Sequence, residues 1–426
     1  MPVFFPVCAL ATTLAAAMPP PPVIRSIEAA PANAAVAQEA HAVIRGNHQF
    51  AVALYRELGK RDGNLFFSPY CINKSLSMTY AGARGATARE MASALQITLP
   101  QDRYPAAFLE ARNAITRSLQ ASTGRFPGQQ GGIEFLLSAT LWGQRGHGFQ
   151  PDFLGVLNKC YGAPLQEVDF AASEQARAAI NRWAAAQTRN RIPELLSDGA
   201  VNAQTRLVLA SAIYFNGDWT TSFSKNDTRD EVFHVNVRAR SPVPMMRNVD
   251  VFGYFEDREA QVLRLPYAGN CLAMLVILPR QMDGLANLEK SLTGDKLWAW
   301  ASKASDQKVH VMLPRFKMDH AFELRPALEQ LGMKSAFVKG AADLSGMDGG
   351  RDKLYIEHVI HKAFVEVNEK GTEAAAATAV IPVPGAAPGA HEPPPIPVFI
   401  ANHPFVFAIY DMHFGAVLFL GRVATP

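Results

Sequence analysis

The chain has 426 residues and a mass of 46.3 kDa, which is too large for a disulfide-stapled miniprotein and leaves room for one large domain or several ordinary ones. Its 49% hydrophobic and 19% charged residues and its mean hydropathy of +0.00 exclude a disordered chain and a protein with many membrane spans. The formal net charge of +3 is too small for the basic field that phosphate neutralisation needs, so we expect no nucleic-acid partner.

The N-terminus carries an apolar stretch, Phe4 to Ala17, followed by a segment rich in proline and alanine. The apolar stretch has the length of a signal-peptide h-region, ends in small residues suited to cleavage, and is too short to span a bilayer. We therefore predict a signal peptide over residues 1–18, a linker over residues 19–40, no membrane span, and a secreted protein in an extracellular or periplasmic compartment.

The four cysteines, Cys8, Cys71, Cys160 and Cys271, lie far apart and form no C-x-x-C pair. No histidine stands beside them at metal-ligand spacing, so we expect no metal site and no cofactor. Removal of a signal peptide would leave an odd number of thiols, which fits buried free cysteines better than a disulfide framework.

Helical patterns dominate the first third of the globular part. Apolar residues recur with helical spacing over Val43–Leu58. Ser68 and Pro69 predict the N-cap and the first residue of a helix that ends near Gly82. The segment Thr87–Glu90 has the pattern of a capping box, which predicts the start of another helix.

Farther along, apolar residues gather in short runs bounded by Gly, Pro, Asn or Asp, a pattern typical of strands. No further linker interrupts the chain until residue 374, so we predict one α+β domain over residues 41–426 with large antiparallel or mixed sheets. The predicted strands are Ile133–Trp142, Leu207–Phe215, Leu272–Leu278, Val309–Leu313, Ala363–Val367, Phe405–Tyr410 and Ala416–Leu420.

One segment departs from these patterns. A strand that starts near His361 turns at Gly371, and the alanine-rich stretch that follows fits either a helix or a strand between tightly packed neighbours. Repeated prolines over residues 382–397 then exclude a helix or a central strand and predict a long exposed loop. Taken alone, the segment fits a tolerated surface insertion, although long loops in compact domains are often functional.

The stretch Val367-Asn-Glu-Lys-Gly-Thr-Glu-Ala-Ala-Ala-Ala-Thr-Ala379 resembles the reactive-loop hinge of the serpins, suicide inhibitors of serine and cysteine proteases. Other serpin-like motifs occur in the order of the family over residues 41–422. The resemblance implies the serpin fold, with helices packed on three β-sheets and an exposed reactive-centre loop, here about residues 369–401. The motifs are Asn64-Leu-Phe-Phe-Ser-Pro69, Leu207-Val-Leu-Ala-Ser-Ala-Ile-Tyr-Phe-Asn-Gly-Asp-Trp219, Pro244-Met-Met246, Leu313-Pro-Arg-Phe316, Ala342-Asp-Leu-Ser-Gly346, His361-Lys-Ala363 and His403-Pro-Phe-Val-Phe407.

The resemblance also implies a mechanism. A protease attacks the loop as a pseudosubstrate, and at the acyl-enzyme stage the hinge inserts into the main sheet as an extra strand and traps the protease. The hinge residues are Glu369, Lys370, Gly371, Thr372, Glu373, Ala374, Ala375, Ala376, Ala377 and Thr378. After insertion, alternate side chains that are small and uncharged would face the core, namely Thr372, Ala374, Ala376, Thr378 and Val380.

The reactive bond is placed by the family pattern. Counting about seventeen loop residues from Glu369 puts it at Gly385–Ala386. The loop is longer than is usual for the family, so Ala390–His391 and His391–Glu392 remain alternatives. No Lys or Arg lies between Lys370 and Arg422, which disfavours a trypsin-like target and favours an elastase-like or subtilisin-like serine protease. We expect the inhibitor to be a monomer.

The family resemblance assigns two further groups of residues by their position in the sequence, the breach and the shutter. Trp219, Arg315 and Glu369 match the breach, where a charge pair beside a tryptophan holds the start of the loop. The shutter is the polar cluster under the strands that must part, and the family usually has Ser, Asn and His there. The matching side chains of this chain have less hydrogen-bonding capacity. The shutter residues are Ser68, Cys71, Ser211 and His361.

Two other functions compete with inhibition. A non-inhibitory serpin acting as a carrier or chaperone would have charged, bulky or proline-containing inward hinge positions, which this hinge lacks, although Pro382 and Pro384 follow it. An acyl-transferring enzyme is suggested by Ser222-Phe-Ser-Lys225, Ser305-Asp-Gln-Lys308 and Ser197-Asp-Gly199, but the order is wrong and no K-T-G follows. We therefore predict an inhibitor and no enzyme.

Overall fold

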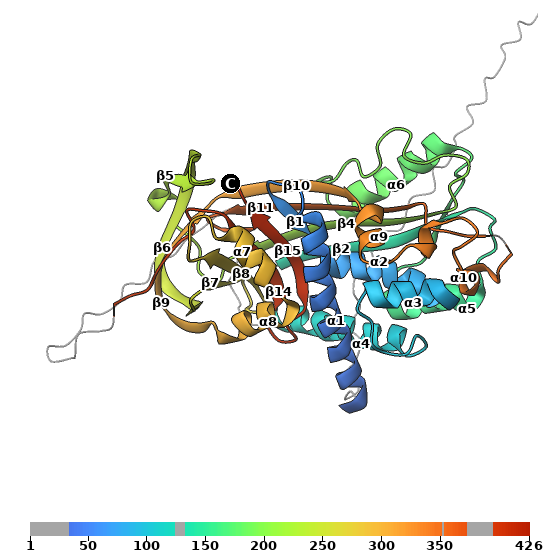
Figure 1. Ribbon diagram of the computed structural model, residues 1–426, viewed down its shortest axis with the longest axis horizontal. Coiled ribbons are helices and arrows are strands. Elements are labelled where there is room, and N and C mark those ends of the chain that lie inside the picture. The colour runs from blue at the N-terminus through green and yellow to red at the C-terminus, as the bar shows by residue number, and fades with distance from the viewer. Residues whose placement is uncertain (1–33, 124–132, 352, 373–394) are drawn as a thin grey trace, which may run out of the picture. The chain divides into compact units, whose positions relative to one another are not determined.

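Helices prevail in the chain up to residue 187 and strands in the rest, so the predicted α+β class is confirmed (Figure 1). The computed structural model describes residues 34–123, 133–351, 353–372 and 395–426, all within one compact unit, Asn33–Pro426. The α-helices are α1 (Ala34–Leu58), α2 (Pro69–Gly82), α3 (Gly85–Ala94), α4 (Tyr104–Thr123), α5 (Pro151–Val156), α6 (Ser173–Gln187), α7 (Leu285–Ser291), α8 (Gly294–Lys303), α9 (Arg325–Gln330) and α10 (Ser345–Asp348).

The strands include every run that the sequence predicts. In chain order they are β1 (Leu65–Phe67), β2 (Ile133–Gln144), β3 (Gln166–Val168), β4 (Leu207–Asp218), β5 (Arg229–His234), β6 (Arg240–Glu256), β7 (Ala260–Pro266), β8 (Leu272–Pro279), β9 (Ser305–Pro314), β10 (Phe316–Glu323), β11 (His358–Asn368), β12 (Gly371–Thr372), β13 (Val398–Ile400), β14 (Phe405–Asp411) and β15 (Val417–Val423). The predicted runs correspond to β2, β4, β8, β9, β11, β14 and β15.

Among the described residues the strands form two hydrogen-bonded sheets. The central sheet has six strands in the order β10-β11-β12-β4-β2-β3, and the large sheet has nine, in the order β1-β15-β14-β8-β7-β6-β9-β13 with β5 on β6. The family resemblance implies three sheets. Here β6 pairs with β5, with β9 and then with β7 along its length, and so joins strands that would otherwise form separate sheets.

The longest strand, β6, has no apolar run that predicts it. Its first part contains Pro242 and Pro244, which cannot donate to a ladder. In that part β6 pairs only with β5, because pairing with β9 begins at Met245. The prolines are therefore tolerated, since one edge of β6 is open where they stand.

Two predicted helix starts have different outcomes. Ser68 caps α2 as predicted, because its Oγ accepts a hydrogen bond from the backbone N–H of Cys71 at 3.1 Å. The capping box at Thr87–Glu90 is wrong: α3 already begins at Gly85, and both side chains reach other segments. Thr87 accepts from the backbone N–H of Asp343, and Glu90 accepts from two backbone N–H groups of residues 334–335.

The first helix starts earlier than predicted. α1 begins at Ala34, so residues 34–40, which were predicted to be linker, are helical. Alanine is the strongest helix former, and a stretch rich in alanine continues as helix when tertiary packing supports it. Ala40, Val43 and Ile44 supply that packing, since all three are buried in the main core.

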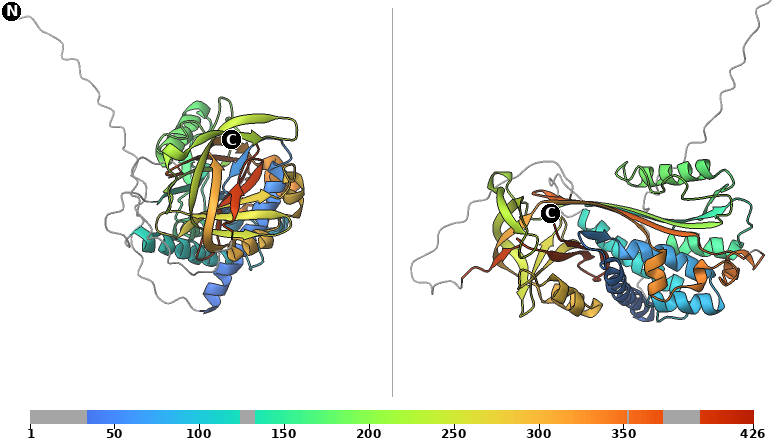
Figure 2. Two further views of the ribbon diagram at one scale, coloured as in Figure 1. Left: turned by 90° about the vertical axis from the view of Figure 1, so that its left-hand side faces the viewer. Right: turned by 45° about the horizontal axis from the view of Figure 1, so that its top comes forward.

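The two faces of the central sheet are covered by different helices (Figure 2). On β4 the side chains of Leu209 and Ile213 face the main core, which α1 and α2 also line. Ala210 and Ala212 face a second, smaller core under α6, to which Trp183 of that helix belongs. The sheet thus separates two apolar layers, and neighbouring side chains on β4 alternate between them.

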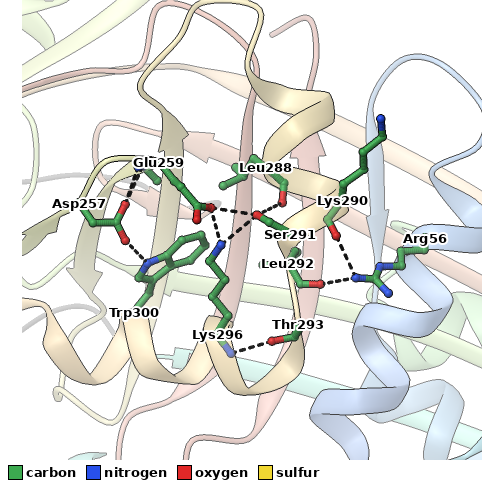
Figure 3. A network of polar contacts seen from close by, with 11 residues as sticks. Arg56, Asp257, Glu259, Leu288, Lys290, Ser291, Leu292, Thr293, Lys296 and Trp300 are labelled. Atoms are coloured by element: carbon green, nitrogen blue, oxygen red, sulfur yellow. Dashed lines mark hydrogen bonds and ion pairs between the residues drawn. The ribbon is translucent and has the colours of Figure 1, made fainter.

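A polar network holds the junction between α7 and α8 against α1 (Figure 3). Arg56 on α1 donates to the carbonyl oxygens of Lys290 and Leu292 at 3.2 and 2.7 Å. Lys296 bridges Glu259 and Ser291, and the Oγ of Ser291 donates to Glu259 at 3.0 Å. The bonds from Arg56 satisfy carbonyl groups at the C-terminal end of α7, which have no partner within the helix.

Cys71, Cys160 and Cys271 are buried, as predicted, while Cys8 lies outside the described residues. In the part of the chain that the structure describes, no cluster of three or more His, Cys, Asp or Glu side chains could hold a metal ion. A search of the same residues finds no helix with the length and apolar character needed to cross a bilayer.

Candidate functional site

A partly filled slot lies between β4 and β11 in the central sheet. These strands pair directly and in parallel from Val208 and His358 up to Tyr214 and Phe364. Beyond that point β12 lies between them, pairing with β11 on one side and with β4 on the other. The sheet therefore already holds the first two residues of an additional strand, and the rest of the slot is closed.

Gly371 is the first residue of that additional strand, so the turn lies one step earlier than predicted, at Glu369 and Lys370. Asn368 supports the turn, because its side-chain oxygen accepts from the backbone N–H of Lys370 at 3.0 Å. A Cβ atom on residue 371 would collide with the backbone of Gly217 on β4. Only glycine lets β12 approach β4 this closely.

Thr372 is fully buried and faces the main core. Its Oγ1 lies 2.9 Å from the hydroxyl of Tyr267, which stacks on Trp219 with ring centroids 4.6 Å apart. Burial raises the pKa of Tyr267, so the phenol stays protonated and can donate. Thr372 is thus fully enclosed and held by one hydrogen bond from an aromatic pair.

The predicted breach residues meet at the turn before β12. The carboxylate of Glu369 is buried and accepts from Arg315 Nε at 2.7 Å and from Thr228 Oγ1 at 2.6 Å. Trp219 donates through Nε1 to the carbonyl of Asn368 at 3.0 Å. Burial alone would raise the pKa of Glu369, but the hydrogen bonds from Arg315 and Thr228 outweigh it and keep the pKa below its usual value.

Replacing Arg315 by leucine is expected to destabilise the native state by about 2 kcal/mol, because it leaves a buried carboxylate without its cation. Thermal unfolding at neutral pH measures the loss as a lower Tm. Arg247→Leu is the matched control: the side chain of its partner Glu231 is 39% exposed, against 2% for Glu369, so this ion pair should contribute less than about 1 kcal/mol. Equal Tm shifts for the two variants would contradict a special role for the Arg315–Glu369 pair.

The predicted shutter residues Ser68, Ser211 and His361 meet where β4 and β11 still pair. Ser211 and His361 are register partners, with Oγ and Nδ1 2.9 Å apart. The backbone N–H of Ser68 donates to Nε2 of His361 at 3.0 Å, and Ser68 Oγ donates to the carbonyl of Leu418 at 2.6 Å. The cluster therefore connects β4 and β11 to α2 and to β15 of the large sheet.

The direction of these bonds follows from the donors. Because a backbone N–H can only donate, Nε2 of His361 must accept from Ser68, and the neutral ring carries its proton on Nδ1. Nδ1 then donates to Ser211, whose own proton goes to the carbonyl of Ile360 at 3.2 Å. Complete burial lowers the pKa of His361 to about 3, so the ring is neutral at neutral pH.

Cys71 lies in the first turn of α2, beside this cluster. Its Sγ lies 3.5 Å from the carbonyl oxygen of Ser138 on β2. Burial raises the pKa of the thiol to about 12, so it remains a neutral, weak donor. At this position it supplies less hydrogen-bonding capacity than a serine would.

The remaining predicted residues lie outside the described residues. The predicted loop, 369–401, is described only at its two ends, which contain β12 and β13. The part of the hinge after Thr372 and the reactive bond therefore stay predictions. They are Glu373, Ala374, Ala375, Ala376, Ala377, Thr378, Gly385 and Ala386.

Sequence patterns missed three residues of this site. Tyr267 bonds to Thr372, Thr228 bonds to Glu369, and the backbone N–H of Phe223 donates to the carbonyl of Glu369 at 2.7 Å. Tyr267 directly follows the apolar strand β7, and a bulky polar aromatic residue in that place was the only available signal. Nothing local distinguishes Thr228 or Phe223.

Comparisons with known proteins agree with this geometry. A family model described as "Serpin (serine protease inhibitor)" matches residues 45–426. Leukocyte elastase inhibitor A of Rattus norvegicus is 40% identical over 392 residues, which cover 89% of this chain and 98% of that protein. Plasminogen activator inhibitor 2 of Homo sapiens is 36% identical with the same coverage. The solved structure of maspin is similar at a TM-score of 0.80 and 27% identity, covering 91% of this chain and 100% of that one. The chain belongs to the serpin family.

Proposed function

We propose that this serpin inhibits a serine protease by inserting its cleaved reactive loop between β4 and β11. The observation that carries the proposal is the register of β12, which already occupies the top of the slot. Extended residue by residue from Thr372, the two registers put Ile381 opposite Val208 of β4 and His358 of β11. These are the last residues at which β4 and β11 pair, so the slot takes the chain up to Ile381.

This limit explains how the prolines are tolerated. Pro382 and Pro384 would follow the paired part of the slot, where a missing N–H group interrupts no ladder. Thr372 faces the core, so alternate residues after it would do the same, and these have small or medium uncharged side chains. They are Ala374, Ala376, Thr378 and Val380.

Insertion exchanges one parallel ladder for two antiparallel ladders. At about 1 kcal/mol per net hydrogen bond, together with burial, the gain is on the order of 10 kcal/mol. A whole protease domain has a stability of similar size, so the gain is sufficient to distort the protease active site and preserve the acyl-enzyme. The protein acts through this conformational change as an inhibitor and not as an enzyme.

Incubation with elastase-like and subtilisin-like proteases tests the proposal. We expect a complex that survives SDS, and a released C-terminal peptide whose mass assigns the reactive bond to Gly385–Ala386. The elastase-like target is supported by the small residues in the loop and by relatives named leukocyte elastase inhibitor. Cleavage without a complex and without a rise in thermal stability would favour a carrier or chaperone-like serpin instead.

We also propose that the protein is exported and acts as a monomer. Export rests on the apolar stretch Phe4–Ala17 and on the small residues in which it ends. Mass spectrometry of protein from the culture medium should find a mature N-terminus near residue 19. A full-length chain retained in the cells would contradict export.

A further inference from the structure

Two cations lie inside the helical layer without a counter-ion. Lys74 on α2 is only 8% exposed, and Arg112 on α4 is half-buried. No residue that the structure describes accepts a hydrogen bond from either side chain or forms an ion pair with it. A buried lysine is rare unless its charge is paired, because desolvation of an unpaired ammonium costs free energy. The described part of this layer therefore contains positive charge that is not compensated.

The two cations lie close together. Lys74 stands one turn after Tyr70 on α2, and Arg112 stands one turn after Phe108 on α4. The rings of Tyr70 and Phe108 stack with centroids 5.8 Å apart, so the helix faces that carry the two cations meet. Burial lowers the pKa of Lys74 to about 8, and the nearby charge of Arg112 adds to this decrease. An anion between the two side chains would remove their repulsion.

The guanidinium of Arg112 lies against Gly162, which follows the π-helical turn η1 (Leu157–Tyr161). A Cβ atom on residue 162 would lie 2.6 Å from Nη1 of Arg112, and its φ angle of +59° is in the left-handed region. Only glycine meets both demands. Tyr161 joins η1 to α2, since its hydroxyl donates to the carbonyl oxygen of Ser77 at 3.2 Å. The segments η1, α2 and α4 therefore surround the two cations.

The hydroxyl of Tyr70 is a third donor at this place. Burial raises the pKa of Tyr70, so the phenol stays protonated, and the charge of Arg112 opposes this rise because the two groups are close. Over the described ranges of the chain this hydroxyl has no hydrogen-bond partner either. Three donors from two helices thus share one place.

None of the described groups beside the cations supplies the missing negative charge. The thiols of Cys71 and Cys160 are neutral, because burial raises the pKa of both. Asp411 is the one carboxylate among the described groups that shift the pKa values of the three donors, and it contributes least to the shift of Tyr70. Its Oδ1 already accepts from the backbone N–H groups of residues 413 and 414. The acceptor for the three donors must therefore come from a ligand.

We propose that Lys74, Arg112 and Tyr70 bind a small inorganic oxyanion of the phosphate or sulfate class. A guanidinium donates through two parallel N–H groups to two oxygens, and the ammonium and the phenol donate to the others. Because Lys74 is almost enclosed, a long polyanion does not reach it, whereas a single tetrahedral anion enters beside the half-buried Arg112. Binding at this site needs no protease, so the inference does not depend on the proposed inhibitory function.

Thermal unfolding of the protein at pH 7 tests the proposal, with phosphate or sulfate compared with chloride at equal ionic strength. A bound anion stabilises the folded state, so we expect Tm to rise by about 3 °C at an anion concentration of about fifty times Kd. Lys74→Met keeps most of the side-chain length without the charge and should show no rise. Lys339→Met is the matched control, because Lys339 is exposed and lies outside these three segments, and it should show the rise of the wild type.

Isothermal titration calorimetry with phosphate is the second measurement. We expect one phosphate per chain for the wild type and for Lys339→Met, and none for Lys74→Met. Equal Tm rises in the wild type and Lys74→Met would mean that the salt acts on the whole protein surface, which would overturn the inference. A wild type that binds no phosphate, or gains no stability over chloride, would overturn it whether or not Lys74→Met folds. SDS-stable complexes with a protease would still support inhibition in either case.

Discussion

Replacing Thr372 by arginine is expected to convert the inhibitor into a substrate that the protease cleaves and releases. Thr372 is fully buried between β4 and β11, with its hydroxyl 2.9 Å from Tyr267. A guanidinium in this place would have no carboxylate partner and would have to stay in solvent, which keeps β12 out of the sheet. An insertion that cannot start leaves time for the acyl-enzyme to hydrolyse.

The yield of SDS-stable complex measures this effect. An insertion penalty of about 3 kcal/mol corresponds to at least a 100-fold loss of complex relative to cleaved product. Glu373→Arg is the matched control, because it places the same charge at the next position, whose side chain would point away from the core. Thr372→Ser should behave like the wild type, since it keeps a small hydroxyl. An arginine variant that still traps the protease would refute the insertion mechanism proposed for β12.

The residues that sequence could predict are those determined by local patterns or carried over from the family. Ser68 follows from local chemistry, because an N-cap serine before proline needs no distant partner. Glu369 and Arg315 are 54 positions apart, and only the family resemblance connected them. Thr87 shows the limit of local patterns: its capping-box spacing is real, but tertiary partners at residues 335 and 343 take its hydroxyl instead.

Residues whose role depends on sheet register could not be predicted. Tyr267 reaches Thr372 only because β12 enters the central sheet beside β4, with Thr372 opposite Gly217, a contact across 105 positions. The same holds for the extent of the slot. The prolines after residue 381 argue against insertion when the sequence is taken alone. In the proposed insertion the paired part of the slot ends at Val208 and His358, before these prolines.

The register also explains what must happen at the shutter during insertion. When the register of β12 is extended from Thr372, Thr378 lies opposite Ser211 of β4 on one side and His361 of β11 on the other. The hydrogen bond between Ser211 and His361 closes the place that Thr378 would occupy, so insertion must break it. The hydroxyl of Thr378 would face the same side as both groups and could then bond to them, which restores the lost contact in the inserted state.

Acidification is expected to remove stability through His361. Its pKa is about 3 in the folded protein and about 6.5 in an unfolded chain, so the unfolded state binds the proton first. The contribution of the neutral ring is therefore complete above pH 6.5 and is lost as the pH falls from 6.5 towards 3. With about 1.4 kcal/mol per pH unit, the loss between pH 7.5 and pH 4.5 amounts to about 2 to 3 kcal/mol.

The variant His361→Gln isolates this term, because glutamine can accept from the Ser68 N–H but does not titrate. Urea unfolding followed by tryptophan fluorescence should show the wild type losing stability more steeply than His361→Gln between pH 6.5 and pH 4.5. Other buried groups, such as His48 and His403, titrate equally in both proteins and cancel in the difference. Parallel pH profiles for the two proteins would mean that His361 is not held neutral by the shutter. The bonds from Ser68 and to Ser211 would then no longer explain how β4 and β11 are kept together until the loop is cleaved.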